Sequence, residues 1–163
     1  MAIETLSVTE MIPNKFEPKR KNRWIFAIEG IDSFLIKTAK RPSATISEQK
    51  IDWINNYRYV AGKITWGDIT VNLYDAISPS GAQQVMEWIR THHETVSGRA
   101  GYADFYKRDC QLKLLDPVGN VIELWDIKGA QIASADFQDL SYGEDTPLEI
   151  SMTLKFDNCV MQY

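Results

Sequence analysis

The chain has 163 residues, 44% hydrophobic and 25% charged, a composition typical of one soluble globular domain. Disordered and collagen-like classes are therefore excluded, and no apolar run approaches the length of a membrane-spanning helix. The net charge of −4 argues against a surface that binds nucleic acid broadly. Residues 1–14 lack the basic start and apolar run of a signal peptide, so we expect synthesis in the cytoplasm and no membrane anchor.

Residues 1–21 have little periodicity and contain two prolines, so we expect an N-terminal arm ahead of a single domain at 22–163. A basic cluster lies at the junction of arm and domain. We interpret it as a contact to acidic side chains of a neighbouring subunit or as a solvated surface, with phosphate binding as a further alternative. The cluster consists of Lys19, Arg20, Lys21 and Arg23.

Residues 22–30 alternate in a strand pattern in which both faces are largely apolar, which is typical of a strand inside a sandwich or barrel. Turn-forming residues at 30–33 precede a second strand pattern at 34–41. We therefore expect these two strands to form a hairpin. Pro42 ends the second strand, because proline cannot donate a hydrogen bond to a ladder.

The segment at 44–61 begins as a strand, at 44–51, and continues into an aromatic-rich stretch that we interpret as a loop. Exposed aromatic side chains in a loop mark a contact surface. The alternative is that they fold back and cover the core. We expect residues 47–60 to project from the domain. The candidate contact residues are Trp53, Ile54, Tyr57 and Tyr59.

The stretch at 62–75 is the strand around which the chain is organised. Apolar residues alternate on one phase up to Trp66 and on the opposite phase from Ile69 onward. Gly67 lies between them, and an isolated glycine in a strand pattern suggests a bulge that redirects the side chains. We therefore expect one long strand that serves two surfaces.

A helix follows, because Ser78-Pro79-Ser80 has the serine caps and the early proline of a helix start. Apolar residues then recur at helical spacing, so the sequence predicts one helix from Pro79 to Val96. His92 and His93 are adjacent on it. Neighbouring residues point about 100° apart on a helix, so these two histidines do not form a metal-binding pair.

The C-terminal part contains a second aromatic loop at 101–108 and then only strand patterns. A turn with Pro117 and Gly119 joins the first two strands in a hairpin. The last strand alternates strictly, which gives it one apolar and one wet face. The expected strands cover 112–115, 121–127, 128–140 and 148–157.

No motif for catalysis is present: the chain has no phosphate loop, nucleophile elbow or metalloprotease motif, and no carboxylates at a catalytic spacing. We therefore expect neither enzymatic activity nor a cofactor. Cys110 and Cys159 lie outside any Cys-x-x-Cys pair, and we expect reduced thiols, with a cross-link at a subunit boundary as a hypothesis. The residues alone predict a mostly antiparallel β domain with one helix, two aromatic loops and a basic arm.

Features shared with one known family span about residues 22–160. The most specific is the segment from Tyr57 to Tyr74, with its Gly-Lys-x-Thr-Trp pattern. Through these features the chain resembles the tail tube proteins of contractile-tailed bacteriophages. The other shared segments are Arg23 to Phe26, Ala39 to Pro42, Trp88-Ile89, Leu115 to Pro117, Trp125, Gly129-Ala130, Asp136-Phe137 and Leu154 to Asp157.

This resemblance implies a mainly β fold of two orthogonally packed antiparallel sheets, a β-sandwich or half-barrel, with one flanking α-helix. It also implies a structural virion protein whose hexameric rings stack into the hollow inner tube of a contractile tail. The implied partners are the subunit itself, the tail sheath outside, and baseplate and tail terminator proteins at the ends. Genomic DNA would pass through the lumen without specific binding. The segment at 47–60 is expected to dock against the neighbouring ring.

Two alternatives remain open. A tube protein of a type VI secretion system or of an extracellular contractile injection system is barely separated from a phage tube by sequence. A β-barrel that binds a small ligand, with Trp24, Trp66 and Trp88 lining a pocket, is the alternative from another class. Rings or tubes of the purified protein would exclude the ligand-binding barrel.

Overall fold

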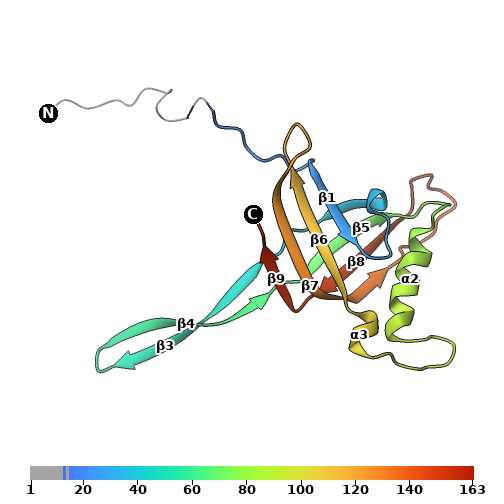
Figure 1. Ribbon diagram of the computed structural model, residues 1–163. Helices are drawn as coiled ribbons and strands as arrows, with labels where there is room; N and C mark the ends of the chain where they lie inside the picture. Colours follow the sequence, from blue (N-terminus) through green and yellow to red (C-terminus); the bar gives the residue numbers. More distant parts are fainter. Residues whose placement is uncertain (1–12, 14) are drawn as a thin grey trace.

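The computed structural model describes residue 13 and residues 15–163. In this part of the chain, nine strands accompany one main helix and two short helical segments (Figure 1). All strand pairs are antiparallel, so the predicted mainly β class with one flanking helix is confirmed. The strands are β1 (Trp24–Ile28), β2 (Ile36–Ala39), β3 (Ala44–Trp53), β4 (Asn56–Trp66), β5 (Ile69–Tyr74), β6 (Arg108–Leu115), β7 (Val121–Asp136), β8 (Glu149–Lys155) and β9 (Asn158–Met161). The helical segments are η1 (Ser33–Leu35), α2 (Gly81–His92) and α3 (Ala103–Tyr106).

Seven strands form one bent sheet in the order β1-β6-β7-β8-β5-β2, with β9 paired to β7. Strand β7 is shared, because its first part pairs with β6 and β9 and its last part pairs with β8. Gly129 lies at this change of partner with a φ of 68°, a conformation that glycine adopts at little cost. The sheet therefore folds over into two layers, with β1 and β6 in one and β5 and β8 in the other (Figure 1).

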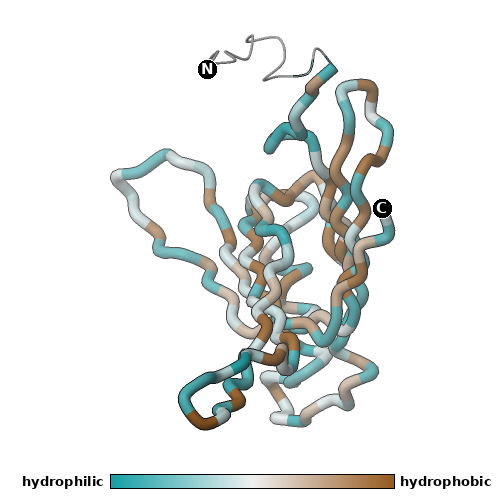
Figure 2. Tube along the Cα trace, turned by 90° about the vertical axis from the view of Figure 1, so that its left-hand side faces the viewer, coloured by the Kyte–Doolittle hydropathy of each residue, from teal (hydrophilic) through white to brown (hydrophobic). Residues whose placement is uncertain are grey.

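The core lies between these layers and consists of the inward-facing residues of the alternating strands. On β5, Ile69, Val71 and Leu73 are fully buried, while Thr70 on the opposite phase is exposed. This is the phase that the alternation predicts. Figure 2 shows hydrophobic and hydrophilic stretches alternating along the strands of the body.

The predicted helix is confirmed as α2, although it is shorter than predicted. The Ser80 side chain accepts a hydrogen bond from the backbone N–H of Gln83 at 3.4 Å, which is the predicted N-terminal cap. The helix ends at His92 rather than at Val96, and the His92 ring packs edge-on against Tyr106 with 4.7 Å between centroids. No helix in the described part of the chain has the length and apolarity to cross a membrane.

The predicted pairing of the first two strands is wrong. β1 pairs with β6, and β2 pairs with β5 in the other layer. The segment between them forms η1, which carries the chain from one layer to the other instead of reversing it in place. The hairpin of β6 and β7 is confirmed. The strand predicted at 128–140 is the continuation of β7, which ends at Asp136, and β9 is an additional short strand.

The strand predicted at 62–75 is divided between β4 and β5. The backbone N–H of Gly67 donates to the carbonyl of Ser43 at 2.8 Å, and a Cβ on Gly67 would lie 2.3 Å from the Ser43 Oγ. The change of phase at this glycine is thus a break between two sheets rather than a bulge. A register shift lies farther out, between Ile46 and Glu48 of β3. The prediction that this stretch serves two surfaces is confirmed.

Candidate functional site

Strands β3 and β4 form a hairpin that extends away from the body as a sheet of its own (Figure 1). Every residue of β3 is exposed, and so is every residue of β4 except Trp66 at its base. The projection predicted for residues 47–60 is therefore confirmed, and the alternative in which the aromatic side chains cover the core is wrong. The strand predicted at 44–51 is confirmed as most of β3, whereas the aromatic stretch after it continues as a regular two-stranded hairpin and not as the predicted loop.

The four aromatic and apolar contact candidates are distributed over both faces and the tip of this hairpin. Asp52 pairs with Tyr57, so Tyr57 and Tyr59 share one face, where their rings lie 5.3 Å apart. Trp53 lies on the opposite face, because adjacent residues of a strand alternate. Ile54 forms the tip, 88% exposed and with a φ of 52°. A β-branched residue rarely adopts this conformation, and such strain concentrates at functional sites.

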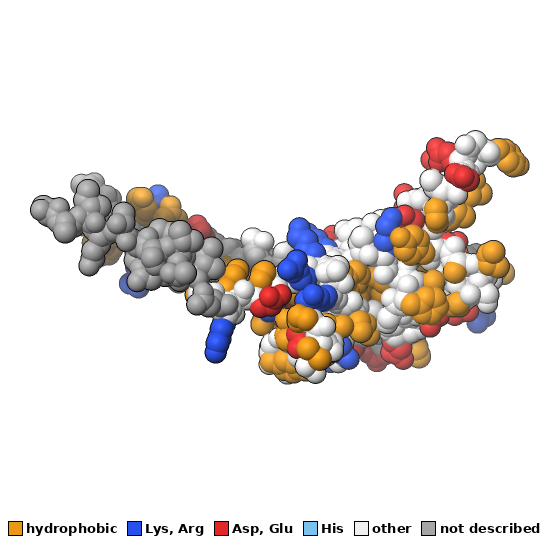
Figure 3. Space-filling model, turned by 90° about the horizontal axis from the view of Figure 1, so that it is seen from above, with side chains coloured by type: hydrophobic (Ala, Val, Ile, Leu, Met, Phe, Trp, Pro, Cys, Tyr) orange, Lys and Arg blue, Asp and Glu red, His pale blue; other side chains and the backbone are white. Residues whose placement is uncertain are grey.

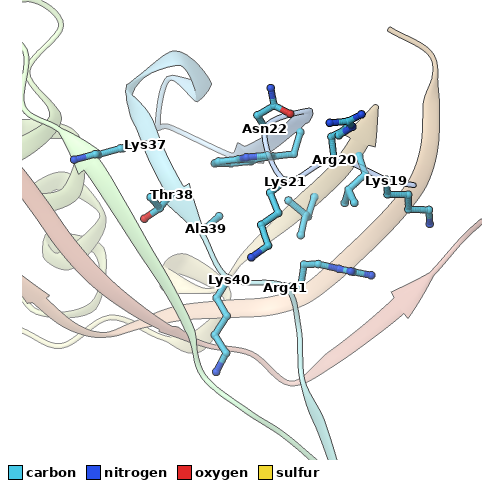
Figure 4. A pocket seen from close by; sticks show the side chains of 12 residues that line it. Lys19, Arg20, Lys21, Asn22, Lys37, Thr38, Ala39, Lys40 and Arg41 are labelled. Carbon is cyan, nitrogen blue, oxygen red and sulfur yellow. The ribbon is translucent and has the colours of Figure 1, made fainter. Parts of the chain in front are cut away.

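A second surface opens between β1 and β2, the two ends of the strand order (Figure 4). A cavity of about 620 Å³ lies there, with Trp24, Leu112 and Leu114 among its lining residues. Cationic side chains surround it, and Lys and Arg side chains gather beside the base of the arm in Figure 3. We call this cavity the basic mouth. Its cationic residues are Lys19, Arg20, Lys21, Lys37, Lys40 and Arg41.

Two of these cations bind Glu123 of β7, whose side chain is only 1% exposed. Lys19 forms an ion pair with one carboxylate oxygen, and Arg41 donates to the other at 2.7 Å. The indole N–H of Trp125 also donates to this carboxylate. Burial alone would raise the pKa of Glu123, but the hydrogen bonds from Lys19 and Trp125 and the charge of Arg41 outweigh it, so the pKa lies below its ordinary value. Glu123 therefore binds the arm and the β2–β3 connection to β7.

Replacing Glu123 with glutamine is expected to lower the free energy of unfolding at neutral pH by about 1.5–3 kcal/mol, because bonds to a charged group are lost. A glutamate whose pKa is depressed by folding stabilises the protein above its unfolded pKa, and this contribution disappears as the pH falls through the folded pKa. The difference between wild type and variant should therefore shrink in acid. Urea unfolding at neutral and acidic pH measures it, with Glu144→Gln in an exposed loop as the control. A difference that stays constant with pH would contradict this role.

The predicted basic cluster is divided by the structure. Lys19 pairs with an acid of its own chain, whereas Arg20 and Lys21 are exposed and line the basic mouth. Arg23 is half-buried just ahead of β1 and is not among the residues that line the mouth. A contact of this cluster with a neighbouring subunit stays a prediction. The sequence pattern does not predict the part played by Glu123 or by the three cations that β2 and the following residues contribute.

The three tryptophans of the ligand-barrel hypothesis do not meet in one pocket. Trp88 belongs to α2 and is buried, and its indole N–H donates to the carbonyl of Tyr106 at 2.7 Å. Trp66 packs against Phe156, with 5.8 Å between ring centroids. Trp24 lines the basic mouth. The arrangement therefore gives no support to a ligand pocket built from these three side chains.

Cys110 and Cys159 are free and buried in the core. Both pair with Ile127, Cys110 from β6 and Cys159 from β9, so β7 separates them and they are not positioned for a disulfide with each other. Burial raises the pKa of Cys110 to about 12 and that of Cys159 to about 11. A cross-link between one of these thiols and a neighbouring subunit stays a prediction. The burial of both thiols disfavours such a cross-link. Among the residues that the structure describes, no three His, Cys, Asp or Glu side chains group into a metal site.

Fold and surfaces together define a class: a mainly β protein with two features open to other chains, the strand edges of its sheet and the projecting hairpin. In the described chain, β1 and β2 each have one strand partner, so each leaves one edge open. Open edges are ready to pair with another chain and are usually protected in monomers. A two-stranded hairpin standing alone is only marginally stable in water.

Comparison with protein-family models and with curated protein sequences finds no match. Solved structures do match. A chain of the sheath/tube terminator of the extracellular contractile injection system PVC, in its extended state, is 15% identical with a TM-score of 0.73, over 91% of this chain and 99% of that one. A chain of the anti-feeding prophage tube-terminating cap is 16% identical with a TM-score of 0.72, over 96% and 99%. A chain of the extended PVC sheath-tube complex is 16% identical with a TM-score of 0.66, over 97% and 99%.

Identities this low show a shared fold. The chain thus has the fold of these contractile injection system chains, and the resemblance to tube proteins inferred from its sequence is confirmed at the level of the fold.

Proposed function

We propose that the chain is the tube subunit of a contractile tail or injection machine, with a structural and not a catalytic role. Hexameric rings of this subunit stack into a hollow tube inside a contractile sheath. The observation that carries the proposal is the hairpin of β3 and β4, which is exposed on both faces and has no partner in the described part of its own chain. The fold shared with chains of a sheath-tube complex and of a sheath/tube terminator supports it.

The open strand edges and the hairpin of β3 and β4 make different contacts in this proposal. Pairing between the open edges of neighbouring subunits removes unprotected backbone groups and closes the ring. The hairpin reaches the next ring, where its aromatic side chains and the Ile54 tip are buried. The sheath then surrounds the tube, and baseplate and terminator proteins bind its ends.

The bacteriophage form of this proposal places the chain in the virion tail, where the tube passes genomic DNA without specific binding. The origin of the similar structures favours the alternative, a tube of an extracellular contractile injection system, because two of them belong to PVC and one to the anti-feeding prophage. Capsid and DNA-packaging genes beside the gene for this chain would identify the tube as that of a bacteriophage tail.

Electron microscopy of the purified protein over a range of concentrations tests the proposal. We expect six-fold rings and stacked tubes, and sedimentation species much heavier than the 18.7 kDa chain. A protein that stays monomeric at every concentration would contradict the proposal. It would favour the alternative hypothesis of a barrel that binds a small ligand.

A further inference from the structure

Opposite charges are segregated along this chain. From Gly129 to Leu154 there are acidic residues but no lysine or arginine. The segment that forms the arm base and β2 is instead rich in lysine and arginine. The acidic residues are Asp136, Asp139, Glu144, Asp145 and Glu149. Glu149 is ion-paired with Lys37 of the mouth within the same subunit. The other four acids give the segment from 136 to 145 a negative potential opposite to that of the mouth.

The basic mouth contains cations that no described residue of its own subunit neutralises. Within the described residues, Arg20, Lys21 and Lys40 form no ion pair. Figure 4 shows Lys21 extending from the arm towards the segment that carries Lys40 and Arg41. The mouth already binds two carboxylates of its own subunit, Glu123 through Lys19 and Arg41, and Glu149 through Lys37. Together with the apolar Trp24 and leucines of its lining, this chemistry fits an acidic segment that also carries apolar side chains.

The loop at 137–148, between β7 and β8, has these properties, and we call it the acidic loop. All of its residues are exposed, and it contains no regular secondary structure. It carries Asp139, Glu144 and Asp145, and between them the exposed apolar side chains of Leu140 and Tyr142. A loop of this length without structure of its own is usually functional in a compact domain.

We propose that the acidic loop of one copy of this chain enters the basic mouth of a second copy. The inference rests on the proposed tube function and assigns one of its subunit contacts. Leu140 and Tyr142 then contact the apolar lining while the carboxylates face Lys21 and Lys40. Because loop and mouth are different surfaces, the contact is head-to-tail, which is the type that closes a ring. Exposed ion pairs contribute little affinity, so the apolar residues supply most of it and the charges fix orientation and partner choice.

Two charge-reversed variants test this contact. The mouth variant carries Lys21→Glu and Lys40→Glu, and the loop variant carries Asp139→Lys and Glu144→Lys. All four residues are exposed, so both variants should fold, which circular dichroism checks. Each variant alone brings like charges together and should need more than about tenfold higher concentration to assemble. Arg90→Glu on the exposed face of α2 is the control and should assemble like wild type.

An equimolar mixture of the two variants is the decisive sample. The loop variant presents lysine at positions 139 and 144 to an unchanged basic mouth, and the mouth variant presents glutamate at positions 21 and 40 to an unchanged acidic loop. In the mixture, the reversed loop meets the reversed mouth and the unchanged loop meets the unchanged mouth, so the two variants accept each other in an alternating ring of even number. We expect rings from the mixture and not from either variant alone. In wild type, a carbodiimide should join Asp139 or Glu144 of an isotope-labelled copy to Lys21 or Lys40 of an unlabelled one.

Failure of this inference can be distinguished from failure of the proposed function. If wild type assembles and either variant alone assembles equally well, the loop–mouth contact is wrong and the tube proposal stands. If the mouth variant fails and the mixture does not rescue it, the mouth has another occupant, such as a nucleic acid phosphate or a different protein, and the inference is overturned. If wild type forms no assembly at all, the proposed function itself fails.

Discussion

Replacing Trp53 and Tyr57 together with alanine is expected to abolish tube formation while the subunit stays folded. Both side chains are exposed, Trp53 to 74%, so the free energy of unfolding should change by no more than about 0.5 kcal/mol. Aromatic anchors at protein contacts are worth about 2 kcal/mol or more each, so the pair removes about 4 kcal/mol, or roughly a thousandfold in association, at each contact between rings. The contact recurs at every ring junction, which multiplies the loss along the tube.

Circular dichroism reports whether the double variant is folded, and sedimentation velocity with electron microscopy reports whether it forms tubes. The matched control is Tyr102→Ala with Phe105→Ala, which removes two exposed aromatic side chains beside and on α3 and should leave tubes intact. Because Trp53 and Tyr57 lie on opposite faces of the hairpin, the two single variants identify the face that docks. If the folded double variant formed normal tubes, the proposal that the hairpin docks against the neighbouring ring would be contradicted.

The elements that depend on local signals are the ones that the sequence predicts correctly. The alternation of Ile69, Val71 and Leu73 predicts the buried face of β5, and the serine at position 80 predicts the cap of α2. These signals work because alternation and capping depend on residues only a few positions apart.

Strand pairing is less predictable, as β1 and β2 illustrate. The chain does turn after β1, where Gly30 has a φ of 81° and Ile28 bridges to Ile31. The turn is followed by η1, which moves β2 into the other layer, where β5 is its partner. Turn residues determine where the chain reverses, whereas the partner of a strand is decided by packing between layers.

The strand predicted at 44–51 forms most of β3, but the aromatic stretch that follows is predicted as a loop for a physical reason. Two-residue hairpin turns usually contain Asn-Gly or Asp-Gly, because their central residues need positive φ angles. Here Ile54 and Asn55 connect the strands, and Ile54 adopts the positive φ. Local rules fail most often at functional or strained positions, and this tip is both strained and exposed.

The basic mouth brings together segments that are far apart in the sequence, so only its arm half is visible as a basic cluster. The one local signal for the rest is Glu123. On β7 it shares the inward phase with Trp125 and Ile127, so an acid lies on the apolar face of a strand. A buried acid at such a position requires cationic partners, although the sequence does not say which residues supply them.

Replacing Trp88 with alanine is expected to remove a large part of the stability of the subunit. Trp88 is 1% exposed, and its indole N–H donates to the carbonyl of Tyr106, the last residue of α3. The Arg108 guanidinium at the start of β6 lies 4.9 Å from the ring centroid. Truncating a buried tryptophan costs about 3–5 kcal/mol, and an unpaired carbonyl adds about 1–3. Domains of this kind are stable by only about 5–15 kcal/mol, so the variant should be close to unfolding at room temperature.

Urea unfolding followed by circular dichroism, at a concentration at which the protein is monomeric, measures this loss. Trp88→Phe should fall between wild type and alanine, because it keeps most of the buried ring and loses the hydrogen bond to Tyr106. The matched control is Trp53→Ala, the same chemical change at an exposed position, which should shift the free energy of unfolding by no more than about 0.5 kcal/mol. If Trp88→Ala unfolded at the same urea concentration as Trp53→Ala, α2 would not be held to the sheet through Trp88. The helix would then depend on Val85 and its cap, since those are its remaining buried apolar side chain and its N-terminal anchor.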